Sequence, residues 1–429
     1  MDLPANPFTF GNPIRDPACF YGRKAEIRQI TSRLLSSAHE STSLVGERRM
    51  GKTSLLNYIA HPDVAPALGM PPEQYCLVYL DFQGLTDITP QRFWQRVLTR
   101  MARSACDPDL ARRFEELAAQ GGLDFFDLED LFEGVAQRGL NVVLLMDEFE
   151  YVTQNANFGA DFFGGLRALA IHYSLSLVPA TRRELVDLCH SEELKGSPFF
   201  NIFANVVLRP FAPEEAEELL AGCAGAAETA LSPEEKAIIA RLGGGHPFFL
   251  QMAGHYLVEG KGQGLAGEEL RAFAADRFDE QADAHLTYLW SHSPESEKIT
   301  LLAALGLGLA KPSRQTVPTL ENLKRLHPRA SLDVVSLGKR GLLLTQDSAY
   351  SLFSPAFARW LAREVVAPAG QEESPASVDA WLTEGGRERL QPVRGTLPRF
   401  KKKYWPILAT VLKEVSFEMI AGVALSKLI

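Results

Sequence analysis

Five short apolar runs in the first half of the chain are separated by helical patterns, and two of these runs end in acidic residues. The runs cover residues 43–45, 76–81, 142–148, 175–178 and 206–208. After the first run, Leu55, Leu56 and Ile59 recur with the three- to four-residue spacing of a helix. Continuous apolar strands that alternate with helices predict a parallel sheet covered on both faces. Ligands of such sheets lie at the carboxyl ends of the strands.

The second half of the chain has a different pattern, because strands give way to helices from residue 213. Helical spacing is seen at 214–221, 233–242, 247–257, 297–305 and 332–339, and two short strands follow at 342–345 and 350–353. Helices that precede a terminal hairpin predict a winged helix. Residues 1–22 are rich in Pro, Asn, Gly and Phe, which predicts an extended arm, and residues 367–377 have the composition of a linker.

One segment carries a specific motif: residues 46–53 read G-E-R-R-M-G-K-T and match the phosphate-binding pattern G-x-x-x-x-G-K-[ST]. Gly46 and Gly51 permit a backbone whose amide N–H groups converge on a polyphosphate, at the positive end of the following helix. Lys52 supplies charge at the outer phosphates, and Thr53 supplies a hydroxyl for Mg²⁺. Because the motif lies between a strand and a helix, it predicts a nucleoside triphosphatase rather than a simple glycine turn.

Polar side chains at the ends of two later strands complete the predicted site. Asp147 and Glu148 follow an apolar run, where Asp147 would hold Mg²⁺ and Glu148 would activate the attacking water. The alternative is a solvated acidic strand end. Arg182 follows the next strand and would stabilise the charge on the transferred phosphoryl group. Thr181 is a second candidate for sensing the γ-phosphate, whereas the neighbouring Arg183 is expected to be a surface residue.

Composition narrows the class of protein. The chain has 429 residues, of which 46% are hydrophobic and 23% charged, with a formal net charge of −9. These values are typical of a globular protein with several compact units, and the acidic balance argues against a general nucleic-acid coat. Its five cysteines are scattered, and the N-terminus has no secretory pattern. We therefore expect a reduced, cytoplasmic protein.

Several segments together resemble the STAND class of signal-transduction ATPases, whose core is related to that of origin-recognition AAA+ proteins. Residues 20–26, F-Y-G-R-K-A-E, look like the family's hydrophobic-Gly-Arg-x-x-Glu box. Residues 142–148 are similar to its Walker B strand, residues 179–182 to its sensor strand, and residues 245–247, G-H-P, to its Gly-x-Pro signature. These segments occur along the chain in the family's order.

The resemblance implies binding of ATP, or less probably GTP, together with Mg²⁺. It also implies slow hydrolysis and an ATP-dependent homo-oligomer, with ADP holding a closed monomer. Catalysis would depend on Glu148, Lys52 and Arg182, and the metal on Thr53 and Asp147. The implied nucleotide contacts are Tyr21, Gly22, Arg23, Gly46, Arg49, Met50, Gly51, Lys52, Thr53, Ser54 and Pro247.

The expected domain order follows from motif and resemblance together. A P-loop sheet domain with helices on both faces is followed by a helical domain, a winged helix and a C-terminal helical segment. The expected boundaries are 1–40 for the arm and adenine-side box, 41–212 for the nucleotide-binding domain, 213–285 for the helical lid, 286–366 for the winged helix, and 367–429 for the linker and C-terminal segment.

The C-terminal segment has its own pattern. Leu408, Leu412, Val415 and Met419 form an apolar face that further apolar residues extend around the helix, and Lys401–Trp405 is basic and aromatic. Three interpretations stay open: docking on the chain's own body, contact of residues 378–429 with another copy or an effector protein, and insertion into a membrane surface. Charged residues interrupt the segment, so a spanning helix is not expected.

Two other functions are consistent with the motifs. A DNA-associated ATPase would use the winged helix, whose third helix offers Ser331, Asp333 and Ser336, with Lys339 and Arg340 at its end. The missing basic face makes this alternative the less favoured one. A nucleotide-stabilised scaffold without turnover would need the same phosphate loop, and only a hydrolysis assay separates it from a switch.

Overall fold

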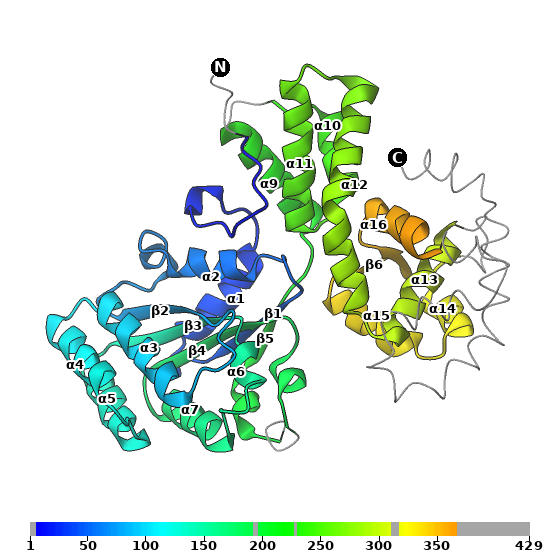
Figure 1. The fold of residues 1–429 in the computed structure, drawn as a ribbon. Helices are drawn as coiled ribbons and strands as arrows, with labels where there is room; N and C mark the ends of the chain where they lie inside the picture. The colour runs from blue at the N-terminus through cyan, green and yellow to red at the C-terminus, as the bar shows by residue number, and fades with distance from the viewer. Residues whose placement is uncertain (1–5, 192–195, 227–229, 310–316, 367–429) are drawn as a thin grey trace. The chain divides into compact units, whose positions relative to one another are not determined.

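The computed structural model describes residues 6–191, 196–226, 230–309 and 317–366, which form two compact units (Figure 1). One unit is Gly11–Gly222, and the other combines the residues up to Phe10 with those from Cys223 onward. The segment at 367–429, for which three interpretations were open, lies outside the described residues. Within the described residues, no helix is long and apolar enough to cross a membrane.

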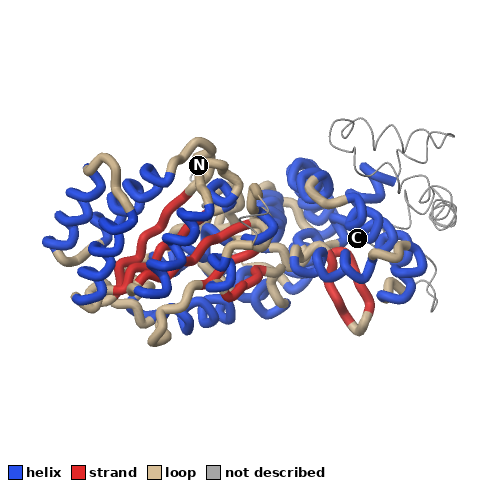
Figure 2. The backbone as a smooth tube through the Cα atoms, turned by 90° about the horizontal axis from the view of Figure 1, so that it is seen from below, coloured by secondary structure: helices blue, strands red, loops and turns tan. Residues whose placement is uncertain are grey.

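The unit Gly11–Gly222 is built on a five-stranded parallel sheet, whose strands are red in Figure 2. The order of the strands is β2-β3-β4-β1-β5. The strands are β1 (Thr42–Gly46), β2 (Tyr75–Asp81), β3 (Asn141–Asp147), β4 (Leu175–Thr181) and β5 (Ala204–Leu208). Each apolar run of the sequence lies in one of them, so the predicted fold class is confirmed. This order brings the carboxyl ends of β3, β4 and β1 together, because these strands are neighbours.

Both faces of this sheet are buried, as continuous apolar strands require. Along β3, Val142, Leu144 and Met146 contribute to one hydrophobic cluster, whereas Val143 and Leu145 contribute to the other. The second cluster includes residues of α1 (Lys24–Leu34) and α2 (Lys52–Ala60). The period of two along each strand therefore divides the core into two layers.

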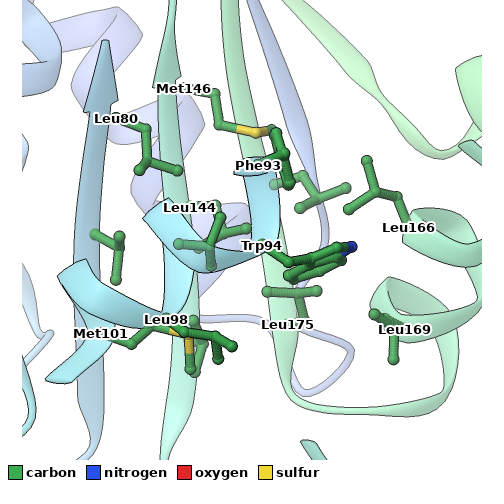
Figure 3. Packing of buried hydrophobic residues seen from close by; sticks show 14 of the residues in the cluster. Leu80, Phe93, Trp94, Leu98, Met101, Leu144, Met146, Leu166, Leu169 and Leu175 are labelled. Carbon is green, nitrogen blue, oxygen red and sulfur yellow. The ribbon is translucent and has the colours of Figure 1, made fainter. Parts of the chain in front are cut away.

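The first cluster is covered by helices of the segment 90–138, which the sequence predicted to be a helical insertion, and by α7. These helices are α3 (Pro90–Ser104), α4 (Pro108–Ala119), α5 (Phe125–Gln137) and α7 (Ala160–His172). Figure 3 shows Phe93, Trp94 and Leu98 of α3 lying over Leu144 and Met146 of β3. Side-chain caps define where the inserted helices start, since Thr89, Asp107 and Asp124 each accept hydrogen bonds from backbone N–H groups of the first turn.

The second unit contains helices and one hairpin. After α9 (Pro213–Ala226), which spans the boundary, come α10 (Pro233–Gly243), α11 (Pro247–Gly262), α12 (Gly267–Ser291), α13 (Glu295–Leu309), α14 (Leu320–Leu326) and α15 (Ala330–Lys339). The antiparallel strands β6 (Leu343–Gln346) and β7 (Ala349–Leu352) and the helix α16 (Pro355–Trp360) follow. The sequence predicted α9, α10, α11, α13, α15 and the hairpin, but not α12, α14 or α16. The assignment as a winged helix stays a prediction.

Two features of this second unit differ from the expected domain layout. The helix α12 runs through the expected boundary between residues 285 and 286, because its buried face continues at four-residue steps through Phe278, Ala282 and Leu286. Residues 6–10 of the expected arm belong to the second unit. The Phe8 side chain is fully buried, and Asn6 Nδ2 donates a hydrogen bond to the His255 carbonyl at 2.9 Å.

Candidate functional site

The predicted phosphate loop joins the end of β1 to the first residue of α2. A Cβ atom on Gly46 would lie 3.0 Å from Leu208 Cβ on β5, so a side chain at this position would require the two strands to move slightly apart. Gly51 has φ +95°, in the left-handed region that glycine adopts without strain. Open space surrounds Gly51, since no atom would lie within 4 Å of an added Cβ. The backbone geometry therefore fits a loop that a polyphosphate approaches closely.

Lys52 is only 5% exposed, and its ammonium group folds back onto this loop. Its Nζ donates hydrogen bonds to the carbonyl oxygens of Gly46 at 2.8 Å and Glu47 at 3.4 Å. The neutral carbonyls orient the ammonium, and its charge acts on the nearby carboxyl groups of Asp147 and Glu148. This arrangement fits the predicted role of Lys52 at the outer phosphates.

Thr53 and Asp147, the two predicted metal ligands, are in direct contact. Thr53 Oγ1 donates a hydrogen bond of 2.6 Å to Asp147 Oδ2, although 94 residues separate them in the chain. Burial raises the pKa of Asp147, and the hydrogen bond from Thr53 and the charge of Lys52 oppose that rise. A hydroxyl and a carboxylate are oxygen ligands that suit Mg²⁺, so the residues present fit this ion.

Tyr79 belongs to the same cluster, although sequence reasoning did not identify it. Its hydroxyl donates a hydrogen bond of 3.1 Å to Asp147 Oδ2. Burial raises the pKa of Tyr79, and the charge of Asp147 raises it further, so the phenol remains a proton donor. The register of β2 on β3 brings Tyr79 close to Asp147. In this register Tyr79 pairs with Leu145, and Asp81 pairs with Asp147.

Glu148, the predicted base, follows β3 with φ 52°, a left-handed conformation that is uncommon for a residue other than glycine. Its backbone N–H donates to Asp147 Oδ1 at 3.1 Å. Burial raises the pKa of Glu148, and the nearby charge of Glu150 raises it further, whereas Lys52 and Arg182 lower it. Since Asp147 and Glu150 are 2% and 1% exposed, this acidic segment is not the solvated strand end that was the alternative interpretation.

Arg182 lies at the same edge but is paired with a residue that the sequence analysis left unassigned. Its Nε donates a hydrogen bond of 2.7 Å to Oε1 of Glu150, the first residue of α6 (Glu150–Thr153). The Arg182 side chain is 35% exposed, whereas that of Glu150 is 2% exposed. The predicted phosphate sensor is thus held by a buried carboxylate. Beside it, Thr181 is buried, and its hydroxyl donates to the Arg183 carbonyl at 2.6 Å.

Arg23 of the predicted adenine-side box is buried beneath the phosphate loop. Its guanidinium donates hydrogen bonds to the carbonyls of Arg209 at 2.7 Å and Met50 at 3.1 Å, and lies 4.5 Å from the centre of the Phe211 ring. Its backbone N–H donates to Glu215 Oε1 at 2.7 Å. Burial lowers the pKa of Arg23, and the charges of Glu26 and Glu215 oppose that shift. Arg23 therefore joins the loop to the segment after β5.

Substitution of Arg23 by Lys is expected to lower the free energy of unfolding by about 2–4 kcal/mol, because an ammonium cannot reproduce the planar fork with which the guanidinium donates to the two carbonyls and to Glu26. Chemical denaturation of the full chain measures this loss. The matched control is Lys24→Ala, since Lys24 is 72% exposed in its ion pair with Glu218 and should contribute about 0–1 kcal/mol. Equal effects of the two substitutions would contradict the anchoring role of Arg23.

The N-terminal residues of this unit lie along the loop. Ser54 Oγ accepts a hydrogen bond from the Ile14 N–H at 3.0 Å, and the Arg49 guanidinium donates to the Gly11 carbonyl at 3.0 Å. Segment 11–14 is thus attached to two predicted nucleotide contacts, Arg49 and Ser54.

The remaining predicted contacts lie in three places. Met50 is buried in the core under the loop. Gly22 lies against Phe211 and Glu215, and the Tyr21 ring lies close against Gly222 of α9. Pro247 begins α11 in the other unit, so its contact with the nucleotide stays a prediction.

A phosphate loop between β1 and α2, with Thr53 and Asp147 in contact at the carboxyl edge of a parallel sheet, defines a P-loop nucleoside triphosphatase. The chain belongs to the family described as Novel STAND NTPase 2, which matches residues 30–306. The STAND resemblance seen in the sequence is therefore confirmed. No curated protein has a significant match to the chain.

Solved structures show the same fold. The Walker-type ATPase PABY2304 of Pyrococcus abyssi is 18% identical, with 83% of this chain and 99% of that chain covered and a TM-score of 0.53. The ORC2 protein of Aeropyrum pernix, solved as ADPNP–ADP complexes, is 14% identical, with coverage of 85% and 98% and a TM-score of 0.52. The predicted similarity of fold to origin-recognition proteins is thus confirmed.

Proposed function

We propose that this chain is an ATP-binding and slowly hydrolysing molecular switch of the STAND type, whose nucleotide state controls self-assembly. The observation that carries the proposal is the 2.6 Å contact between Thr53 Oγ1 and Asp147 Oδ2. It brings a loop hydroxyl and a strand-end carboxylate to one point, beside the Lys52 ammonium. Membership in a STAND NTPase family supports the same proposal.

The roles of the residues follow from their chemistry. Lys52 would bind the outer phosphates, and Thr53 and Asp147 would hold Mg²⁺, which when bound neutralises charge on the phosphate oxygens. Glu148 would accept the proton of the attacking water, because a carboxylate whose pKa is raised is a stronger base than an ordinary one. Arg182 would stabilise the charge that develops on the transferred phosphoryl group.

The test of the switch is the mass of the full-length particle, measured by light scattering with ADP and with a slowly hydrolysed ATP analogue. We expect a monomer with ADP and an oligomer at least twice that mass with the analogue. The comparison variant is Lys52→Ala, which should stay monomeric with both nucleotides. An unchanged mass in the wild-type chain would refute nucleotide-controlled assembly while leaving nucleotide binding itself intact.

DNA association receives no support from the arrangement of α15, the helix whose polar residues were candidates for base contacts. Asp333 Oδ2 accepts hydrogen bonds from Ser296 at 2.7 Å and Thr300 at 2.8 Å, inside the unit. Arg340 is buried as well, with 7% exposure. The helix exposes the apolar side chains of Leu332, at 67%, and Val335, at 58%, and Lys339 at its end is exposed as well. A salt-dependent gel shift with duplex DNA tests this alternative directly.

A further inference from the structure

The contact between Glu150 and Arg182 has a consequence for the nucleotide cycle. The Glu150 carboxylate is almost completely buried, and Arg182 Nε reaches its Oε1 at 2.7 Å. Within the described part of the chain, the other oxygen, Oε2, is also buried and accepts no hydrogen bond. The charge of this carboxylate is therefore balanced chiefly by one guanidinium group.

Losing that partner would be unfavourable for Glu150. Removing one member of a buried ion pair leaves an uncompensated charge in a medium of low dielectric constant, which is strongly destabilising. Arg182 does not face the same constraint, because its side chain is one-third exposed and water can solvate it. The pair is consequently asymmetric: Glu150 depends on Arg182 more than Arg182 depends on Glu150.

The sheet places Arg182 where a bound triphosphate would end. β4 lies between β3 and β1, with Thr181 opposite Val45, so the residue after Thr181 emerges between the phosphate loop and Asp147. Glu148 lies in the same cluster, since the charges of Glu150 and Arg182 act on its carboxyl in opposite directions. A γ-phosphate at this edge would offer the guanidinium a second anionic partner.

We propose that Glu150 is a positioning residue that competes with the γ-phosphate for Arg182, so that the Glu150–Arg182 pair biases the site toward ADP. This inference rests on the proposed function. With ADP, no γ-phosphate is present and the pair stays intact. With ATP, Arg182 is drawn toward the γ-phosphate, and the weakening of its contact with Glu150 reduces the affinity for ATP relative to ADP.

The experiment compares the affinities of the full-length chain for ADP and a slowly hydrolysed ATP analogue by calorimetry, in wild type, Glu150→Gln, Arg182→Gln and the double variant. Glutamine keeps the shape of Glu150 and removes its charge, so the competing ion pair becomes an ordinary hydrogen bond. We expect Glu150→Gln to bind the analogue about tenfold more tightly than wild type, with unchanged affinity for ADP. In the Arg182→Gln background the same substitution should have no effect.

Controls separate this role from a general effect on folding. Glu297→Gln removes the charge of another buried carboxylate that pairs with an arginine, Arg340, in the other unit, and should leave the ratio of the two affinities unchanged. If Glu150→Gln does not fold, Glu150→Met serves instead. Its apolar side chain has a similar length and leaves no buried charge or unpaired polar group, so it should shift the ratio in the same direction.

Each outcome has one meaning. Weaker binding of the analogue by Glu150→Gln would overturn the proposal, because Glu150 would then be holding Arg182 toward the phosphate. A tenfold effect that persists in the Arg182→Gln background would also overturn it, since the effect would not act through Arg182. Equal affinities of wild type and Glu150→Gln for the analogue refute the competition alone, whereas a wild-type chain that binds neither nucleotide refutes the proposed function.

Discussion

Lys52→Ala is expected to weaken the binding of both ATP and ADP by about a hundredfold or more, the largest effect on nucleotide binding that we predict for a single substitution. Lys52 is 5% exposed and its ammonium is held by the carbonyls of Gly46 and Glu47, so it enters the nucleotide complex already oriented. Truncating one partner of a buried, hydrogen-bonded charge pair costs about 2–5 kcal/mol, and each 1.4 kcal/mol changes the affinity about tenfold.

Calorimetric titration of the full-length chain with each nucleotide measures this loss. The unfolding midpoint without nucleotide should change little, because the substitution removes a buried charge rather than an apolar contact. Lys24→Ala is the comparison for a lysine of the same unit at an exposed position. Binding within threefold of wild type would show that the loop does not hold the phosphates, and the proposed function would fall with it.

Sequence reasoning located the sheet and the phosphate loop because both depend on local patterns. The apolar runs at 142–148 and 175–178 are recognisable without knowing their neighbours, and the loop motif covers eight consecutive residues. The order of the strands was not predicted from the sequence and is known only from the structure. The contact of Thr53 with Asp147 is the geometric result of that order, since it joins the ends of segments 94 residues apart.

Tyr79 and Glu150 were not identified because their roles depend on partners that no local pattern reveals. A tyrosine within a strand is an ordinary β-forming residue, and only the register of β2 on β3 directs it toward Asp147. Glu150 is separated by 32 residues from Arg182, and by its sequence it is one more acid in an acidic segment. Its burial is what distinguishes it, and burial of a single acid cannot be read from spacing.

Arg23 shows how far the role of a residue can be predicted from its similarity to a family pattern. The box at residues 20–26 was recognised from its similarity to a family, and that similarity implies proximity to the adenine. In the structure the guanidinium contacts the carbonyls of Met50 and Arg209, so its measurable contribution is to join the phosphate loop to the segment after β5. A family pattern places a residue in a region of the fold, whereas the donors and acceptors around it decide what its side chain does.

Glu148→Gln is expected to lower the rate of ATP hydrolysis by about a hundred- to a thousandfold while the affinity for ATP stays within a few fold of wild type. Glutamine has the shape of glutamate but cannot accept the proton of the attacking water. The backbone N–H of residue 148 can still donate to Asp147 Oδ1, so the metal ligand should keep its orientation. Single-turnover release of phosphate, measured with excess enzyme, separates this step from product release.

The pH dependence of the same reaction provides an independent check. Burial, together with the charge of Glu150, raises the pKa of Glu148 above the ordinary value of 4.5. The base acts only when deprotonated, so wild-type turnover should fall as the pH decreases through a value above 4.5, and Glu148→Gln should lack that decline. Asp81→Asn, at the end of the neighbouring strand, is the control for loss of a carboxylate and should keep most of the activity. Undiminished turnover in Glu148→Gln would exclude Glu148 as the base. A wild-type chain that binds ATP without hydrolysing it would instead support a nucleotide-stabilised scaffold.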